Sequence, residues 1–312
     1  MSASFFRRGL FGYGLLKRFG LLFLIRGVLI GALSLVAQAV EQDLAQLQGA
    51  AQAGDAQAQY QLGVIYADAL QGVKRDYTQA AHWFELAAKQ GHVSAQTRLG
   101  YSYATGQGVK RNPGLSARWY RKAAEAGDPV AQTNLGFAYV IGQGVRLNFK
   151  VAAEWFRKAA AQGYASAQAN LGVMSMIGQG VSKNLDAAKS LFELAAAQNN
   201  KVAQFNLGMM YESGNGVPKD YAKAVELLRL AADQGYPEAQ VSLGAMYANG
   251  NGVKQDFRYA YFWTHIPAEN GDRTAIKQRD LVATYLKPEQ IFELRQLAAK
   301  WKPGQPVDLG NP

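Results

Sequence analysis

The dipeptide Leu-Gly recurs along this chain at a nearly constant interval. The first two copies lie 37 residues apart and the later ones 36. A fixed period of this length predicts a solenoid of stacked supersecondary units, and six copies exceed the roughly three that a continuous core needs. The six copies are Leu62-Gly63, Leu99-Gly100, Leu135-Gly136, Leu171-Gly172, Leu207-Gly208 and Leu243-Gly244.

Each copy contains two helical patterns joined by a glycine-rich turn. In the third copy, Ala131, Leu135 and Tyr139 lie on one arc of a helix. The sequence Gly-Gln-Gly-Val follows at residues 142–145 and is typical of backbone with positive φ. A second helix then has apolar residues at three- and four-residue spacing. We therefore expect each unit to be a first helix, called helix A, a turn, and a second helix, called helix B.

Polar residues and glycines at fixed positions predict the helix ends. An Asp or Asn precedes each helix B, and such side chains accept a hydrogen bond from a free backbone N–H at a helix start. A Gly follows helix B in most copies, and one copy has Asn199 there, which suits the left-handed position after a helix. Pro129 and Pro237 fall where helix A should begin. The predicted N-caps are Asp76, Asn112, Asn148, Asn184, Asp220 and Asp256.

A glycine in the middle of helix A is unusual. It costs about 0.8–1.0 kcal/mol relative to alanine, so six of them cost about 5–6 kcal/mol. We expect the compensation to be a close approach of two helices, with the small Ala152 and Ala159 opposite Gly136.

The combined pattern resembles the Sel-one-like repeat, a slightly longer relative of the tetratricopeptide repeat. It reads A-Q-x-x-L-G-x-x-Y-x-x-G-x-G-V, then Asp or Asn, then A-x-x-W-x-x-x-A-A-x-x-G, and it covers residues 56–271. The resemblance implies an all-α, right-handed α-solenoid that acts as a protein–protein interaction scaffold without catalytic residues. Two departures are minor. The first turn, at residues 69–73, has one extra residue and lacks its first glycine, and Leu191 and Leu227 replace tryptophan.

The first 39 residues differ from the rest of the chain. They contain five basic residues and no acidic one, then a ten-residue apolar run at 27–36 and an Ala-Gln-Ala site at 37–39. This order predicts a secretory signal peptide that is cleaved after Ala39. The alternative is an uncleaved membrane anchor, which would place Arg26 in the bilayer at a cost of about 2.5–3.5 kcal/mol.

Composition limits the classes of partner. The net charge of the whole chain is +10, but without residues 1–39 it falls to +5, from 28 basic and 23 acidic residues. No basic cluster with interleaved aromatic residues is present, so we expect no nucleic-acid partner. The chain has no cysteine, which excludes disulfides and thiolate metal sites.

The sequence predicts capping helices at both ends of the repeat array. Residues 40–55 predict an N-terminal capping helix. Residues 272–302 predict two C-terminal capping helices, because terminal repeats must close the core with a polar outer face. The last segment, 303–312, has three prolines and two glycines, so we expect it to be disordered.

A search for catalytic residues gives none. His82, His92 and His265 have no common spacing, and the Gly-x-Gly turns lack the preceding strand of a nucleotide-binding loop. We therefore predict a protein that is not an enzyme, with no cofactor and no metal site.

Helix A has a second stripe of apolar residues away from the Leu-Gly arc. By the resemblance, helix A lines the concave face of the solenoid, where an apolar strip suits a bound helix or extended peptide. Two interpretations stay open, since these residues either line a groove or pack as core. Asn134, Asn170 and Asn206 precede the repeated leucines and should make backbone hydrogen bonds between repeats, or else bind the partner. The predicted partner-binding residues are Tyr101, Phe137, Val140, Val173, Met176, Phe205 and Met209.

We therefore expect a non-enzymatic scaffold of the bacterial cell envelope, periplasmic or secreted, that binds a protein or peptide in this groove. The chain would touch a membrane only through an uncleaved segment 1–39. The first alternative is an assembly factor tethered to the inner membrane and facing the periplasm. The second is a module that binds peptidoglycan or polysaccharide, or an envelope hydrolase.

Overall fold

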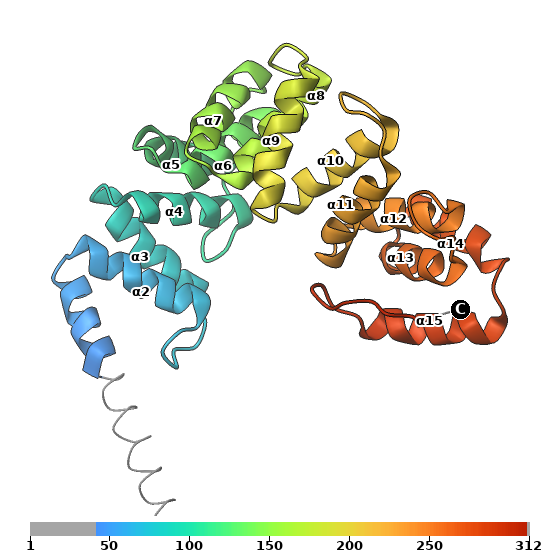
Figure 1. The fold of residues 1–312 in the computed structure, drawn as a ribbon. Helices are drawn as coiled ribbons and strands as arrows, with labels where there is room; N and C mark the ends of the chain where they lie inside the picture. The colour runs from blue at the N-terminus through green and yellow to red at the C-terminus, as the bar shows by residue number, and fades with distance from the viewer. Residues whose placement is uncertain (1–41, 311–312) are drawn as a thin grey trace, which may run out of the picture. The chain divides into compact units, whose positions relative to one another are not determined.

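The computed structural model describes residues 42–310, which form helices and no strand (Figure 1). Residues 42–52 are helical. The later helices are α2 (Ala56–Asp68), α3 (Tyr77–Lys89), α4 (Val93–Thr105), α5 (Pro113–Glu125), α6 (Pro129–Ile141), α7 (Phe149–Ala161), α8 (Ala165–Ile177), α9 (Leu185–Ala197), α10 (Lys201–Ser213), α11 (Tyr221–Asp233), α12 (Pro237–Asn249), α13 (Phe257–Glu269), α14 (Arg273–Ala283) and α15 (Pro288–Lys300). The signal peptide or anchor predicted at 1–39 lies outside the described residues.

The chain divides into two compact units. The first ends at Arg111 and the second begins at Asn112. In the first, α2 and α3 pack against each other, and Leu44, Leu47 and Ala51 of the preceding helix pack with Leu62 of α2. In the second, successive helices from α5 to α13 pack as neighbours around a core of alanine, leucine and aromatic side chains. Both units have the predicted order of helix A, turn and helix B.

The predicted caps are confirmed. All six Asp and Asn residues before helix B accept a backbone N–H through their side chains, as Asn148 does from Val151 at 3.2 Å. Pro129 and Pro237 each begin a helix A. The glycines after helix B, and Asn199 in their place, have positive φ.

The glycine within helix A allows a close approach, as predicted, but the neighbour is an aromatic ring. A Cβ added at Gly136 would lie 2.8 Å from the ring of Phe156 and 3.2 Å from the carbonyl oxygen of Ala152. Phe192 occupies the same place beside Gly172, and Leu228 beside Gly208. The cost of the glycine is therefore offset by burying a large side chain of helix B against a bare helix backbone.

From the second repeat on, the second glycine of the turn lies against the start of the preceding helix B. A Cβ at Gly144 would collide with the carbonyl oxygen of Pro113, and one at Gly180 with that of Phe149. These turns have positive φ as well, so no other residue fits without moving the chain. The turn thus holds one repeat against the next within the second unit.

A buried glutamine joins helix A to helix B. The side chain of Gln132 is only 4% exposed and donates to the carbonyl oxygen of Ala124 at 3.1 Å. Gln162, after helix B of the same repeat, donates to the Gln132 side chain at 2.9 Å and to the Gly127 carbonyl at 3.0 Å. Gln198 with Gln168 and Gln234 with Gln204 repeat the amide pair. The Gln of the A-Q motif is therefore a buried, hydrogen-bonded residue.

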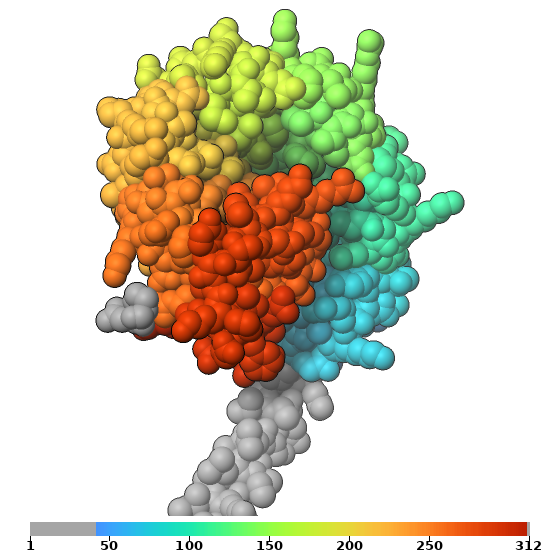
Figure 2. All heavy atoms as spheres, turned by 90° about the vertical axis from the view of Figure 1, so that its right-hand side faces the viewer, coloured from blue at the N-terminus to red at the C-terminus, as the bar shows by residue number. Residues whose placement is uncertain are grey.

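The C-terminal segment is ordered, so the prediction of disorder for 303–312 is wrong for residues 303–310. The segment turns back after α15, where Gly304 donates to the carbonyl oxygen of Asp233 at 2.7 Å. Leu309 donates to the hydroxyl of Tyr259 at 3.1 Å, and Arg258 donates to the carbonyl oxygens of Leu309 and Gly310. In Figure 2 the red C-terminal residues lie over the orange helices that precede them. The prolines and glycines shape a fold-back here, because apolar side chains beside them find a surface to cover.

Candidate functional site

The predicted strip lies on helix A of four repeats. Tyr101, on α4, belongs to the first unit, and the other six residues lie on α6, α8 and α10 of the second. Tyr101 and Phe137 are the most exposed, at 48% and 51%. Val140, Val173, Met176, Phe205 and Met209 are each half-buried.

The half-buried members are partly core. Val173, Met176, Phe205 and Met209 pack against the main hydrophobic cluster of the second unit, and Val140 packs against a smaller one. Phe205 also contacts Tyr236, with ring centres 5.3 Å apart. These five side chains therefore rest on the core and leave one edge open to solvent.

Two further apolar residues widen the exposed part of this strip. Ile141 and Ile177 are 48% and 55% exposed, and each ends its helix four residues after Phe137 or Val173. The i, i+4 spacing puts each on the same helix face as the strip residue before it. Helices α6 and α8 are neighbours in the second unit. The sequence could have predicted both isoleucines, because each continues the apolar spacing of the strip by one more helical turn.

Asparagine amides lie along the same helix face. Asn206 donates to the carbonyl oxygen of Val202 in its own helix at 2.7 Å, so the expected backbone bond between repeats is wrong for this residue. Asn134 and Asn170 form no side-chain hydrogen bond among residues 42–310 and are partly exposed. Their amides are therefore free to donate and accept next to the apolar side chains of α6 and α8.

Charge is sparse beside these residues. In the next repeat, Glu212 of α10 occupies the position of Val140 and Met176. Burial raises the pKa of its carboxyl above the usual value, and the ammonium of Lys219 opposes that shift. The surface over α6 and α8 is thus apolar with neutral amides, and it becomes acidic towards α10.

The described part of the chain has no cluster of three or more metal-ligating side chains. His92 begins α4, and its Nδ1 accepts from the backbone N–H of Ala95 at 3.2 Å. His82 is exposed on α3. His265 is buried and stacks on Tyr261, with ring centres 5.4 Å apart. The three histidines thus lie in three unrelated environments, namely a helix cap, an exposed helix face and a buried ring stack. Among residues 42–310, none of the helices is both long enough and apolar enough to cross a bilayer.

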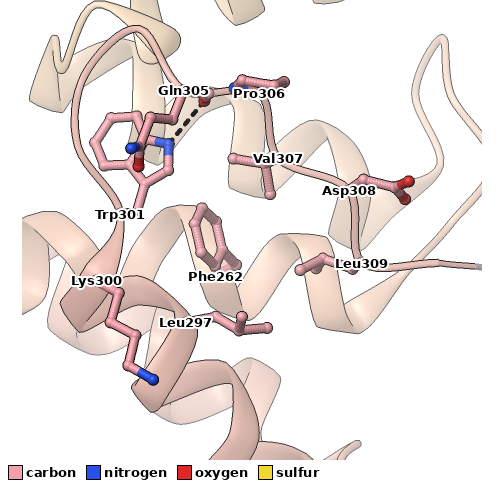
Figure 3. Close-up of a pocket in the computed structure, with 9 residues that line it drawn as sticks. All are labelled: Phe262, Leu297, Lys300, Trp301, Gln305, Pro306, Val307, Asp308 and Leu309. Atoms are coloured by element: carbon pink, nitrogen blue, oxygen red, sulfur yellow. Dashed lines mark hydrogen bonds between the residues drawn. The ribbon is translucent and has the colours of Figure 1, made fainter. Parts of the chain in front are cut away.

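A small pocket of about 200 Å³ lies under the C-terminal segment (Figure 3). Phe262 and Leu297 face it from two helices, and Val307 and Leu309 point into it from the returning chain. The indole N–H of Trp301 donates to the carbonyl oxygen of Gln305 at 3.0 Å and closes the turn. The apolar side chains of the returning segment cover this surface, so we interpret the pocket as a gap within the C-terminal packing and not as a ligand site.

Comparison with known proteins agrees with this architecture. The Sel1 repeat family matches residues 56–92, 93–128, 129–164, 165–200, 201–236 and 237–272. A Sel1 repeat protein from Oxalobacter formigenes has a similar solved structure. It is 33% identical, covers 80% of this chain and 99% of its own, and gives a TM-score of 0.65.

Two further relatives share parts of the chain. The structure of c5321, described as a protective antigen of uropathogenic Escherichia coli strains with an SLR fold, is 29% identical over 88% of this chain and 77% of its own, with a TM-score of 0.36. HRD3A of Arabidopsis thaliana, a component of an ERAD-associated E3 ubiquitin-protein ligase, is 39% identical over 66 residues, which are 21% of this chain. The chain spans about a tenth (10%) of that relative's length.

The matched segments run without a break through all six predicted repeats, and α2 to α13 supply one helix A and one helix B for each of them. The chain therefore belongs to the Sel1 repeat family, whose members act as protein–protein interaction scaffolds.

Proposed function

We propose that this protein holds an extended peptide segment of a partner protein along the exposed edge of helices α6 and α8. One observation supports this most directly: Phe137, Ile141 and Ile177 expose about half of their apolar surface, and the free amides of Asn134 and Asn170 lie on the same helices. Apolar side chains bind the partner's side chains, and amides pair with its backbone, as an extended peptide requires.

The geometry favours an extended segment over a bound helix. An extended chain exposes backbone N–H and C=O groups that need partners once water is excluded. A helix satisfies these groups internally, so it would leave the two asparagine amides unused. Asn134 and Asn170 lie 36 residues apart, so the third and fourth repeats each offer the partner backbone one free amide.

Photo-crosslinking in cells tests this proposal. A photoreactive phenylalanine analogue at Phe137 should give a discrete adduct with another protein, identified by mass spectrometry. The same probe at Glu154, which is exposed on helix B of the same repeat, is the matched control and should not give that adduct. Adducts from both positions, or self-adducts alone, would contradict the proposal.

Substitution separates binding from folding. Phe137→Asp with Ile177→Asp should abolish the adduct from a probe at Ile141, because two charges would have to be desolvated against the partner. Both side chains are about half exposed, so the far-ultraviolet circular dichroism should be unchanged. Leu194→Asp, at a 55% exposed leucine on helix B, is the control and should keep the adduct. Met209 is a poorer choice because it packs against the core.

The proposal includes a location in the bacterial envelope. It rests on the basic segment, apolar run and Ala-Gln-Ala site of residues 1–39. N-terminal sequencing of the protein from its cell should give Val40 as the first residue. An intact Met1 or Ser2 in a membrane fraction would support a tethered assembly factor instead.

A further inference from the structure

A polar pocket of about 260 Å³ lies in the first unit, away from α6 and α8. The end of α2, the start of α3 and helix α4 surround it. Phe84, which is 2% exposed, lies at its base, and the charged residues Asp68, Arg75 and Arg98 line it. Tyr101, a member of the predicted strip, also lines it.

The charges in this pocket do not balance. Arg98 and Asp68 are 3.9 Å apart with both side chains 45% exposed, which is a weak ion pair. Arg75 has no carboxylate partner within residues 42–310, and its guanidinium lies 5.9 Å from the ring centre of Tyr77. Two cations face one anion, so the pocket has one positive charge to spare. Tyr77 and Tyr101 add hydroxyl groups that can donate to an anion.

The pair of arginines is particular to this repeat. Position 75 is in the turn of the first repeat and position 98 in helix A of the second. The corresponding positions further along the chain are Arg111 with Asn134, Leu147 with Asn170, Lys183 with Asn206, Lys219 with Ser242, and Gln255 with Gln278. None of these pairs has two guanidinium groups, which bind carboxylates through parallel N–H···O bonds better than an ammonium does.

We propose that this pocket binds the carboxylate of a single acidic side chain in a peptide segment. The proposal rests on the protein-binding function above and names the chemistry of one contact. A carboxylate matches the one spare positive charge, whereas Asp68 would repel the second charge of a phosphate dianion. Tyr101 forms a wall of the pocket and is 48% exposed, so it can contact the apolar neighbour of the acidic residue.

Peptide binding to the full chain tests this. The probe is a pool of acetylated, amidated peptides of leucine and phenylalanine with one glutamate, compared with a pool that has glutamine in its place. Hydrogen bonds to a charged group are stronger than those to a neutral one, so the glutamate pool should bind at least about tenfold more tightly. A third pool with phosphoserine should bind more weakly than the glutamate pool. Equal binding of the glutamate and glutamine pools, or tightest binding of phosphoserine, would overturn the proposal.

Three variants locate the effect. Arg75→Gln with Arg98→Gln should remove the preference for glutamate, and Asp68→Asn should strengthen it because the competing carboxylate is gone. Lys183→Gln, at the position of Arg75 in the fourth repeat, should leave it unchanged. A glutamate preference that survives the double arginine change would place the carboxylate elsewhere. The adduct from Phe137 reports the proposed function separately, so either experiment can fail without the other.

Discussion

Helices α7 and α13 are the helix B of the third and of the sixth repeat. The outer face of α7 is exposed to solvent, whereas the outer face of α13 is buried. Glu154 of α7 is exposed, and the corresponding Phe262 of α13 is 2% exposed beneath Trp301 and the C-terminal segment. Arg157 of α7 is exposed, and the corresponding His265 is 6% exposed. The inner faces are alike, since Ala152 and Ala260 are both fully buried.

The difference shows that the repeat fixes the inner side of helix B and leaves the outer side to its surroundings. Helices α5, α9 and α11 have Arg118, Ser190 and Glu226 at the position of Phe262, all exposed. Among the helices B of the second unit, this position is aromatic in α13 alone, where α15 packs against it. The last repeat of a solenoid has no following repeat to cover its core. Here the C-terminal elements also cover the outer face of the last helix B.

The largest expected effect comes from removing the covered ring. Phe262→Ala should lower the free energy of unfolding by about 3–5 kcal/mol, because the cavity adds to the lost burial. The matched change Glu154→Ala on α7 should alter it by less than about 0.5 kcal/mol. Urea denaturation followed by circular dichroism measures both. Equal effects of the two changes would mean that α15 does not cover α13 in solution.

Removing the returning segment should have an intermediate effect. Deletion of residues 303–312 exposes part of Phe262 and loses Val307 and Leu309, which are half-buried against the core. At about half of a full side-chain burial each, the two side chains together account for a loss of about 1.5–3 kcal/mol. Thermal unfolding measures it, with Lys300→Ala at the exposed rim as the control. An unchanged melting temperature after deletion would refute the fold-back.

The smallest effect concerns pH. Burial lowers the pKa of His265 below its ordinary value of 6.5, with Arg279 and Arg295 acting in the same direction and Glu269 opposing them. The unfolded chain then binds the proton more readily, so the stability that is present above pH 6.5 should fall as the pH drops below it. His265→Asn should reduce the difference in melting temperature between pH 7.5 and pH 5.5. Arg157, on the exposed face of α7, supplies the control variant Arg157→Asn, which should keep that difference.

Local sequence signals predicted the fold of the repeats well. The Leu-Gly interval, the Asp and Asn caps and the glycines that follow helix A each have a cause within one repeat, so the local pattern is sufficient to place them. The end of the chain was different. Prolines and glycines at 303–312 favoured disorder by composition, and the contacts of Val307 and Leu309 depend on a surface that forms only after folding. Phe262 stands where the earlier helices B of the second unit have a polar residue, and this difference was the available sign that another segment covers α13.

The candidate site was predicted in part. The 36-residue period located the strip on helix A, but period alone does not determine exposure. Phe137 and Met209 occupy the same position in their repeats, yet Phe137 is half exposed and Met209 packs against the core. The pocket between Arg75 and Arg98 joins residues of two repeats, and only the packed structure brings them together.

The tight contact of the second turn glycine, such as Gly144, has a consequence for how such a protein evolves. Gly144 and Gly180 have no room for a side chain, so a duplicated repeat inherits its turn almost unaltered. The position occupied by Asn134 is free of this restriction, and the copies already differ there, with Gln61, Arg98 and Ser242 in other repeats. Duplication therefore supplies a constant frame, and new specificity can arise by single substitutions at one helix position without loss of the stack.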